Sequence, residues 1–149
     1  MAQPTTARFG KFLIEIGDGA TPEVFSAPCG FTSKSLTLTK NLEEVNIPDC
    51  ADPDKVAWVG RDASSLSASV SGEGVLASES VGIWLDAFES TESVSVRISI
   101  QFATKTVTWV GKVHLSTFTP SADQGGRVTA AVEMQSDGEL VMTVTPHVP

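Results

Sequence analysis

Residues 93–102 read SVSVRISIQF, and polar and apolar side chains alternate strictly along this segment. Successive side chains of a β-strand point to opposite faces of the sheet. One face of the strand is therefore apolar, and it carries Val94, Val96, Ile98, Ile100 and Phe102. The other face is polar, and it carries Ser93, Ser95, Arg97, Ser99 and Gln101. The segment predicts an antiparallel sheet with one buried face and one wet face.

The same period-two alternation recurs in most of the chain, where Ser and Thr alternate with branched apolar residues. It predicts further strands at residues 9–16, 24–27, 34–40, 106–117, 127–135 and 139–145. Gly111 interrupts one of them and indicates a bulge or a close approach of another segment. Asp137-Gly138 predicts a two-residue hairpin between the last two strands, because Gly readily adopts the positive φ of such a turn. We expect a mainly β fold, an antiparallel β-barrel or β-sandwich.

One segment follows a helical period instead. Its large apolar residues are spaced by three, four and seven positions, and they are Val81, Trp84, Leu85 and Phe88. This spacing places them on one face of a helix. We therefore expect a helix over residues 79–89 that flanks the sheet and turns these four side chains into the core.

Residues 41–65 read NLEEVNIPDCADPDKVAWVGRDASS and show little periodicity. Two prolines and many acidic residues predict a long loop, and loops of this length inside a compact domain are usually functional. The segment also contains Trp58, a large apolar residue that a free loop has no reason to expose. Two interpretations stay open: Trp58 contacts a partner, or it folds back onto its own domain.

Length and charge limit the class of protein. A chain of 149 residues suits one domain, residues 1–149. The net charge of −8 argues against a protein that binds nucleic-acid phosphates through clustered Lys and Arg. No apolar run is long enough to span a membrane and no secretion signal is evident, so we expect synthesis in the cytoplasm. Cys29 and Cys50 are either free thiols or a disulfide pair.

The sequence contains no recognisable catalytic or metal-binding set. Neither His114 nor His147 accompanies a nucleophile motif. Asp49, Asp52 and Asp54 lack the spacing of a calcium loop, and the cysteines lack the spacing of a zinc site. We therefore expect neither an enzyme nor a metal or organic cofactor.

The order of these segments resembles the major tail tube protein of long-tailed, non-contractile bacteriophages, a family whose features gene transfer agents share. The stretches that carry the resemblance are FTSKSLTLTK at 31–40, IPDC at 47–50 running to Trp58, Arg61-Asp62 followed by SVSGEGVL at 69–76, GKV at 111–113, VE at 132–133 and SDGEL at 136–140. They cover most of the chain, and their order is more specific than any one motif.

The resemblance implies a β-barrel or β-sandwich that forms hexameric rings, which stack into a hollow tube in the virion tail. Such a tube holds the tape measure protein, meets tail terminator and tail tip proteins at its ends, and conducts DNA without binding it specifically. An acidic lumen repels DNA phosphates. We expect a single tail tube domain with no appended immunoglobulin-like decoration domain.

The resemblance also implies roles for particular residues. The long loop would contact the neighbouring ring through Asp49, Asp52, Asp54, Lys55, Trp58, Arg61 and Asp62. For the lumen wall, the alternation of residues 93–102 predicts that their polar face lines the bore through Ser93, Ser95, Arg97, Ser99 and Gln101.

Two other functions remain as alternatives. The first is the tube subunit of a type VI-like contractile injection system, which has the same fold. The second is a monomeric ligand-binding β-sandwich, such as a carbohydrate-binding module, with Trp58 and Trp109 as its stacking platform.

Overall fold

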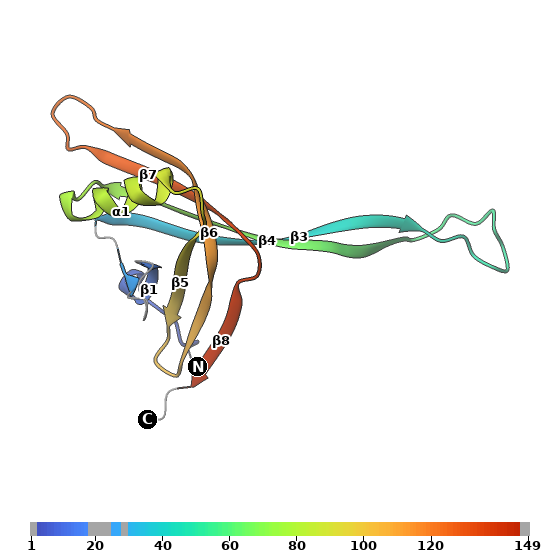
Figure 1. Ribbon diagram of the computed structural model, residues 1–149. Coiled ribbons are helices and arrows are strands. Elements are labelled where there is room, and N and C mark those ends of the chain that lie inside the picture. The colour runs from blue at the N-terminus through green and yellow to red at the C-terminus, as the bar shows by residue number, and fades with distance from the viewer. Residues whose placement is uncertain (1–2, 18–24, 28–29, 147–149) are drawn as a thin grey trace.

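The computed structural model describes residues 3–17, 25–27 and 30–146 and consists mainly of antiparallel strands (Figure 1). The elements are the 3-10 helix η1 (Phe9–Lys11), β1 (Phe12–Gly17), β2 (Phe25–Ser26), β3 (Phe31–Asn46), β4 (Val59–Val75), α1 (Ser78–Glu89), β5 (Val94–Gln101), β6 (Lys105–Ser121), β7 (Thr129–Ser136) and β8 (Val141–Pro146). The expected mainly β fold with one flanking helix is confirmed.

All strands belong to one sheet with the order β2-β1-β5-β6-β7-β4-β3, and β8 adds a second partner to β6. The two ends of this order come together because the sheet curls. Lys34 on β3 donates a hydrogen bond of 2.7 Å from Nζ to the carbonyl oxygen of Phe12 on β1, and its ammonium lies 4.4 Å from the centre of the Phe9 ring. Burial lowers the pKa of Lys34. The curled sheet matches the expected barrel-like architecture.

β7 and β8 pair with the same edge of β6, one after the other. β7 pairs with Val113–Ser121 and β8 with Lys105–Val110, and all these pairings are antiparallel. Gly138 has the expected positive φ of 89°, and the Asp137 N–H donates to the Lys112 carbonyl oxygen at 2.8 Å. The chain therefore kinks at Gly138 and continues along β6. The predicted hairpin is wrong because β6 is long enough to hold both strands.

The predicted long loop over residues 41–65 is also wrong in most of its length. β3 and β4 pair from Phe31 opposite Gly74 to Asn46 opposite Val59, with a register shift after Phe31 and another after Asn41, so only residues 47–58 of this segment are a loop. Figure 1 shows this hairpin extending far from the body. We call residues 41–65 the arm and residues 47–58 its tip. Both faces of the arm are exposed, and without a buried face the sequence has no reason to alternate.

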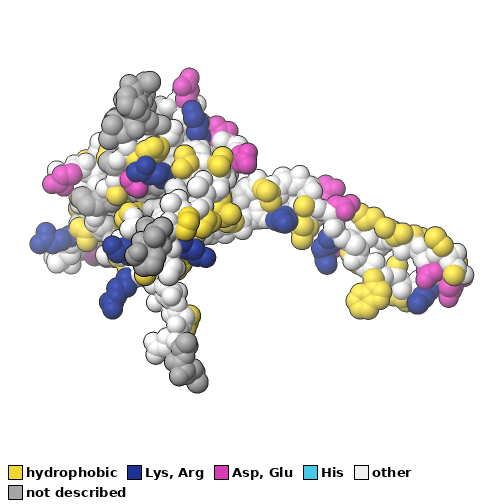
Figure 2. All heavy atoms as spheres, turned by 90° about the horizontal axis from the view of Figure 1, so that it is seen from below, with side chains coloured by type: hydrophobic (Ala, Val, Ile, Leu, Met, Phe, Trp, Pro, Cys, Tyr) yellow, Lys and Arg dark blue, Asp and Glu magenta, His cyan; other side chains and the backbone are white. Residues whose placement is uncertain are grey.

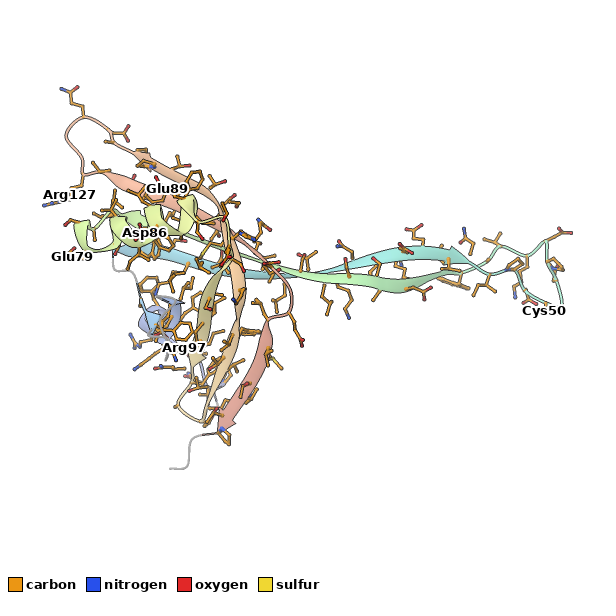
Figure 3. The ribbon with its side chains drawn as sticks, in the orientation of Figure 1. Cys50, Glu79, Asp86, Glu89, Arg97 and Arg127 are labelled. Atoms are coloured by element: carbon orange, nitrogen blue, oxygen red, sulfur yellow. The ribbon has the colours of Figure 1, made fainter. Side chains whose placement is uncertain are left out.

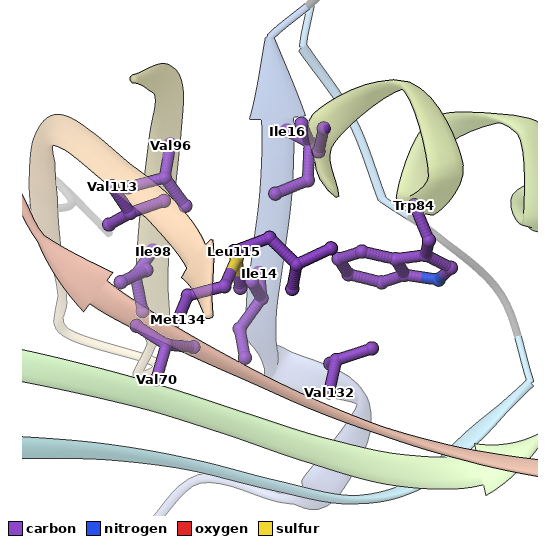
Figure 4. Close-up of a cluster of buried hydrophobic side chains, with 11 residues drawn as sticks. Ile14, Ile16, Val70, Trp84, Val96, Ile98, Val113, Leu115, Val132 and Met134 are labelled. Carbon is purple, nitrogen blue, oxygen red and sulfur yellow. The ribbon is translucent and has the colours of Figure 1, made fainter. Parts of the chain in front are cut away.

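The core lies where the body strands face one another beneath α1 (Figure 4). Its buried side chains come from β1, β4, β5, β6, β7 and α1, and they are Ile14, Ile16, Val70, Trp84, Ala87, Val96, Ile98, Val113, Leu115, Val132 and Met134. Polar and apolar residues alternate along these strands because every second side chain points into this cluster.

Helix α1 is in the expected place, but its buried face differs from the expected one. Trp84 is buried and meets the Phe31 ring edge-on, with 5.6 Å between ring centres. Val81 is only half-buried, and Leu85 and Phe88 are 44% and 55% exposed. The residues turned to the sheet are Ser80, Trp84 and Ala87. Small side chains on either side of Trp84 let the helix approach the sheet, a feature that apolar spacing does not reveal.

We predict that Ile98→Ala lowers the free energy of unfolding by about 2–5 kcal/mol, because it leaves a cavity in the core. Ile98 is 0% exposed, whereas Ile47 at the tip is 69% exposed. The matched control Ile47→Ala is expected to change stability by less than about 0.5 kcal/mol. Chemical denaturation of the dilute subunit measures both, and equal effects would contradict this core.

We predict opposite effects for one substitution at two glycines. A Cβ at Gly111 would meet the Leu140 side chain and lie 2.7 Å from the Glu139 carbonyl oxygen. Gly111→Ala is therefore expected to destabilise the fold by about 1–3 kcal/mol. A Cβ at Gly82, an exposed position of α1, meets nothing within 4 Å. Gly82→Ala is expected to stabilise by up to about 1 kcal/mol. The same denaturation experiment tests both signs.

Candidate interaction surfaces

The arm is held together by polar groups that face each other across its two strands. Nδ2 of Asn41 donates to Oγ of Ser65 at 2.8 Å, and Oγ of Ser64 donates to the Asn41 carbonyl oxygen at 3.1 Å. Arg61 lies 3.7 Å from Glu44. Cross-strand pairs of this kind stabilise a two-stranded ribbon only modestly. An isolated hairpin is marginal in water, so the arm is a candidate for contact with another chain.

Large apolar side chains are exposed at the base of the arm, along it and at its tip (Figure 2). They are Leu38, Leu42, Val45, Ile47, Val56, Trp58, Val59 and Leu66. Trp58 is 96% exposed and therefore does not fold back onto its own domain. The sequence singled out Trp58 but not Leu42, because residues 41–65 were predicted to be a loop. Exposed apolar surface of this extent marks an interaction site.

The tip has a defined local structure. Oδ1 of Asp49 accepts hydrogen bonds from the N–H groups of Ala51 and Asp52 at 2.8 and 3.3 Å. The Lys55 N–H donates to the Asp52 carbonyl oxygen at 3.1 Å. Five of the seven residues expected to contact a neighbouring ring gather in this tip: Asp49, Asp52, Asp54, Lys55 and Trp58. The other two, Arg61 and Asp62, lie on β4 at the outer end of the arm, opposite Glu44 and Glu43.

The polar face of β5 is more enclosed than expected of a lumen wall. Arg97 makes two hydrogen bonds to Glu15 on β1, at 2.8 and 3.2 Å, and its guanidinium lies 4.6 Å from the centre of the Phe25 ring. The hydrogen bond to Glu15 raises the pKa of Arg97. This pair explains a basic group on an otherwise neutral face, and sequence reasoning missed Glu15 as its partner.

The other four residues of this face are also covered to different degrees. Ser93, Ser95 and Gln101 are half-buried, and Ser99 is 5% exposed. A buried side chain cannot line a bore, so Ser99 is a correction to the expected set. A lumen role for the others stays a prediction.

A groove of about 740 Å³ opens at the base of the arm. Its walls come from β3, β4, β6 and the kink between β7 and β8, and they include Leu38, Leu66, Trp109 and Leu140. No sequence signal predicted the groove, because it depends on the kink at Gly138. Trp109 lies in this groove and Trp58 at the far end of the arm, so the two do not form the platform expected of a ligand-binding module.

Within the described ranges, no three His, Cys, Asp or Glu side chains come close enough to hold a metal ion. The aspartates of the tip are therefore better explained by the turn around Asp49. Cys50 is exposed at the tip, and Cys29 lies outside the described residues. No helix in the described part of the chain combines the length and apolar character that a membrane crossing needs.

Several solved structures share this fold. The chain is similar to a subunit in the tail of an empty gene transfer agent particle with C6 symmetry, with 18% identity, 93% of this chain and 99% of that chain covered, and a TM-score of 0.73. It is similar to the SPP1 tail tube protein, with 13% identity, coverage of 97% and 81%, and a TM-score of 0.61. It is also similar to a chain of the sheath-tube complex of PVC, an extracellular contractile injection system, with 14% identity, coverage of 94% and 93%, and a TM-score of 0.59.

The sequence itself matches no curated protein. It does match a family model, described as phage tail tube protein, over residues 6–142. This match includes the arm, the helix and every strand of the body except β8, of which only Val141 and Met142 lie within it. The chain belongs to the phage tail tube protein family.

Proposed function

We propose that this chain is the structural subunit of a tail tube, in which rings of six copies stack through their arms. The observation that carries the proposal is the arm, a two-stranded extension with an apolar tip that no described residue of the same chain covers. Family membership and the fold shared with tail tubes support it. The C6 symmetry belongs to the gene transfer agent tail, and we transfer it to this chain as part of the proposal.

The sheet edges support lateral assembly into rings. Within the described residues, β3 pairs only with β4, and β8 pairs only with β6, so both strands leave one edge unpaired. Exposed edges readily pair with strands of other chains. A closed ring of identical subunits removes such edges, which a single curled sheet cannot do by itself.

The charge suits a tube that conducts DNA without binding it. Each copy carries a net charge of −8, and a ring multiplies this charge by the number of copies. A wall of this sign repels phosphates and lets DNA slide. The same tube would hold a tape measure protein and meet terminator and tip proteins at its ends, and we place it in the tail of a phage or gene transfer agent particle.

The two alternatives have less support. The likeness to the contractile injection system concerns the fold alone, whereas the family model names a phage tail tube protein. A monomeric ligand-binding module gives no role to the arm. Trp58 and Trp109 also lie too far apart to stack on one ligand.

We predict that Trp58→Ala strongly weakens tube assembly but leaves the subunit folded. Trp58 is almost fully exposed, so its loss changes the stability of the subunit by less than about 0.5 kcal/mol. A buried aromatic anchor at an interface contributes about 2 kcal/mol or more, so the protein concentration needed for assembly rises by more than about tenfold. Negative-stain electron microscopy of concentrated protein measures assembly, and denaturation measures stability.

Two further variants make this result specific. Trp58→Phe keeps an aromatic anchor and is expected to form tubes. Deletion of residues 49–54 removes the acidic part of the tip and is expected to prevent stacking. Tubes of unchanged yield and length from both Trp58→Ala and the deletion would contradict a role for the tip. Failure of the parent protein to form any ring or tube, even on a tail tip complex, would contradict the proposed function.

A further inference from the structure

The groove at the base of the arm has the character of a receptor for an apolar group. Leu38 and Leu66 on its rim are well exposed, and Trp109 and Leu140 on its floor are half-buried. Leu38 lies opposite Ala68, and Lys40 lies opposite Leu66, so these side chains share the face of the hairpin that is turned to the groove. An exposed apolar surface beside a groove is typical of a binding site for another apolar group.

We propose that this groove receives the tip of the arm of a second copy of this chain, with Trp58 as the inserted side chain. The inference rests on the proposed function, and it specifies which surface of one ring binds the arm of the next. In the described chain, Trp58 is an exposed apolar side chain without a pocket, and the groove is an apolar pocket without an occupant. The two surfaces are therefore complementary.

The occupant must come from another copy because the arm cannot reach back to its own base. Its ladder runs from Lys40 opposite Leu66 to Asn46 opposite Val59, with one register shift between Asn41 and Leu42. At about 3.3 Å per strand residue, these six steps place Trp58 roughly 20 Å beyond the groove. Figure 3 shows the arm extended along this whole length, with Cys50 at its far end. Folding back would break the pairing of β3 and β4.

The size of the groove suits a tryptophan with its apolar neighbour. Pockets that enclose whole drug-sized molecules have volumes of about 300–1,000 Å³, and the groove measures about 740 Å³. An indole and the nearby Val56, which is also almost fully exposed, fit this space. Tryptophan in a desolvated pocket is a frequent energetic centre of protein interfaces.

Charges around the two surfaces complement each other. The groove carries Lys40 and Glu139, and neither has an ion pair within the described residues. The tip carries three aspartates, among them Asp54, and next to it Lys55. The aspartates can meet Lys40 while Lys55 meets Glu139. Charged pairs at a rim contribute more to orientation than to affinity, so they would fix how the tip enters.

The contact joins the tip of one copy to the groove of another, two different surfaces, so it does not form a closed symmetric dimer. Each copy would offer one tip and one groove, and such a heterologous contact repeats along an axis. This is the behaviour that stacking of rings requires. It also gives the stack two different ends, one with free tips and one with empty grooves.

Cross-linking through the native Cys50 tests the contact, because this exposed thiol already marks the tip. In a chain with Cys29→Ser, we introduce Lys40→Cys or, separately, Glu139→Cys, two exposed positions on the groove. Tubes are assembled, treated with a short bismaleimide and analysed by mass spectrometry. The control is Thr119→Cys, an exposed position on β6 near its hairpin with β7, remote from the groove.

We expect at least about tenfold more intermolecular linkage from Cys50 to position 40 or 139 than to position 119, since docking raises the local concentration of one thiol near the other to the millimolar range. Cys50→Ser should remove this linkage. Tubes in which Cys50 is not linked to either groove position, or is linked equally to position 119, would overturn the groove as the receptor and leave the tube function intact. A parent chain that forms no tubes would overturn the proposed function and this contact with it.

Discussion

The pairing of β6 is the constraint on which the rest of the body depends. β6 holds β5 along one edge and β7 and then β8 along the other, and it bends at a bulge between Leu115 and Thr117. A bulge increases the local twist and lets one strand serve two parts of a curled sheet. The partner edge must bend as well, and Gly138 supplies the kink. The groove at the base of the arm is a consequence of this kink, so the assembly surface follows from the geometry of one strand.

The arm obeys a different constraint, because it has no core. Its stability within one subunit depends on the ladder between β3 and β4 and on cross-strand polar pairs such as Asn41 with Ser65. Such pairs contribute little each, whereas the exposed side chains of Leu42, Val56 and Trp58 disfavour an arm that stays in water. Contact with another copy removes this apolar surface from water. In the proposed assembly, the arm is therefore the element through which one subunit contacts another.

The sequence predicted most strands and the helix, but it missed the strand pair of the arm. The strict alternation of residues 93–102 located β5 within one residue at each end, and the spacing of Trp84 located α1. Residues 41–65 showed no alternation because neither face of the arm is buried, so a strand pair was taken for a loop. Glu15 could be seen only as one polar residue between Ile14 and Ile16, and nothing in the sequence links it to Arg97. The sequence pattern of the arm therefore gave no sign of its strands. Contacts between residues far apart in the sequence, such as Glu15 with Arg97, become visible only in the folded structure.

The projecting arm also allows an acidic chain to assemble with copies of itself. Like charges repel at a distance, and this repulsion opposes the approach of subunits that each carry a net charge of −8. Salt screens such repulsion within about 10 Å at moderate ionic strength, so apolar contacts can decide the outcome once surfaces meet. The arm places its apolar tip roughly 20 Å beyond the groove of its own subunit. A projecting anchor thus makes the first contact while the acidic bodies are still separated by more than a screening length.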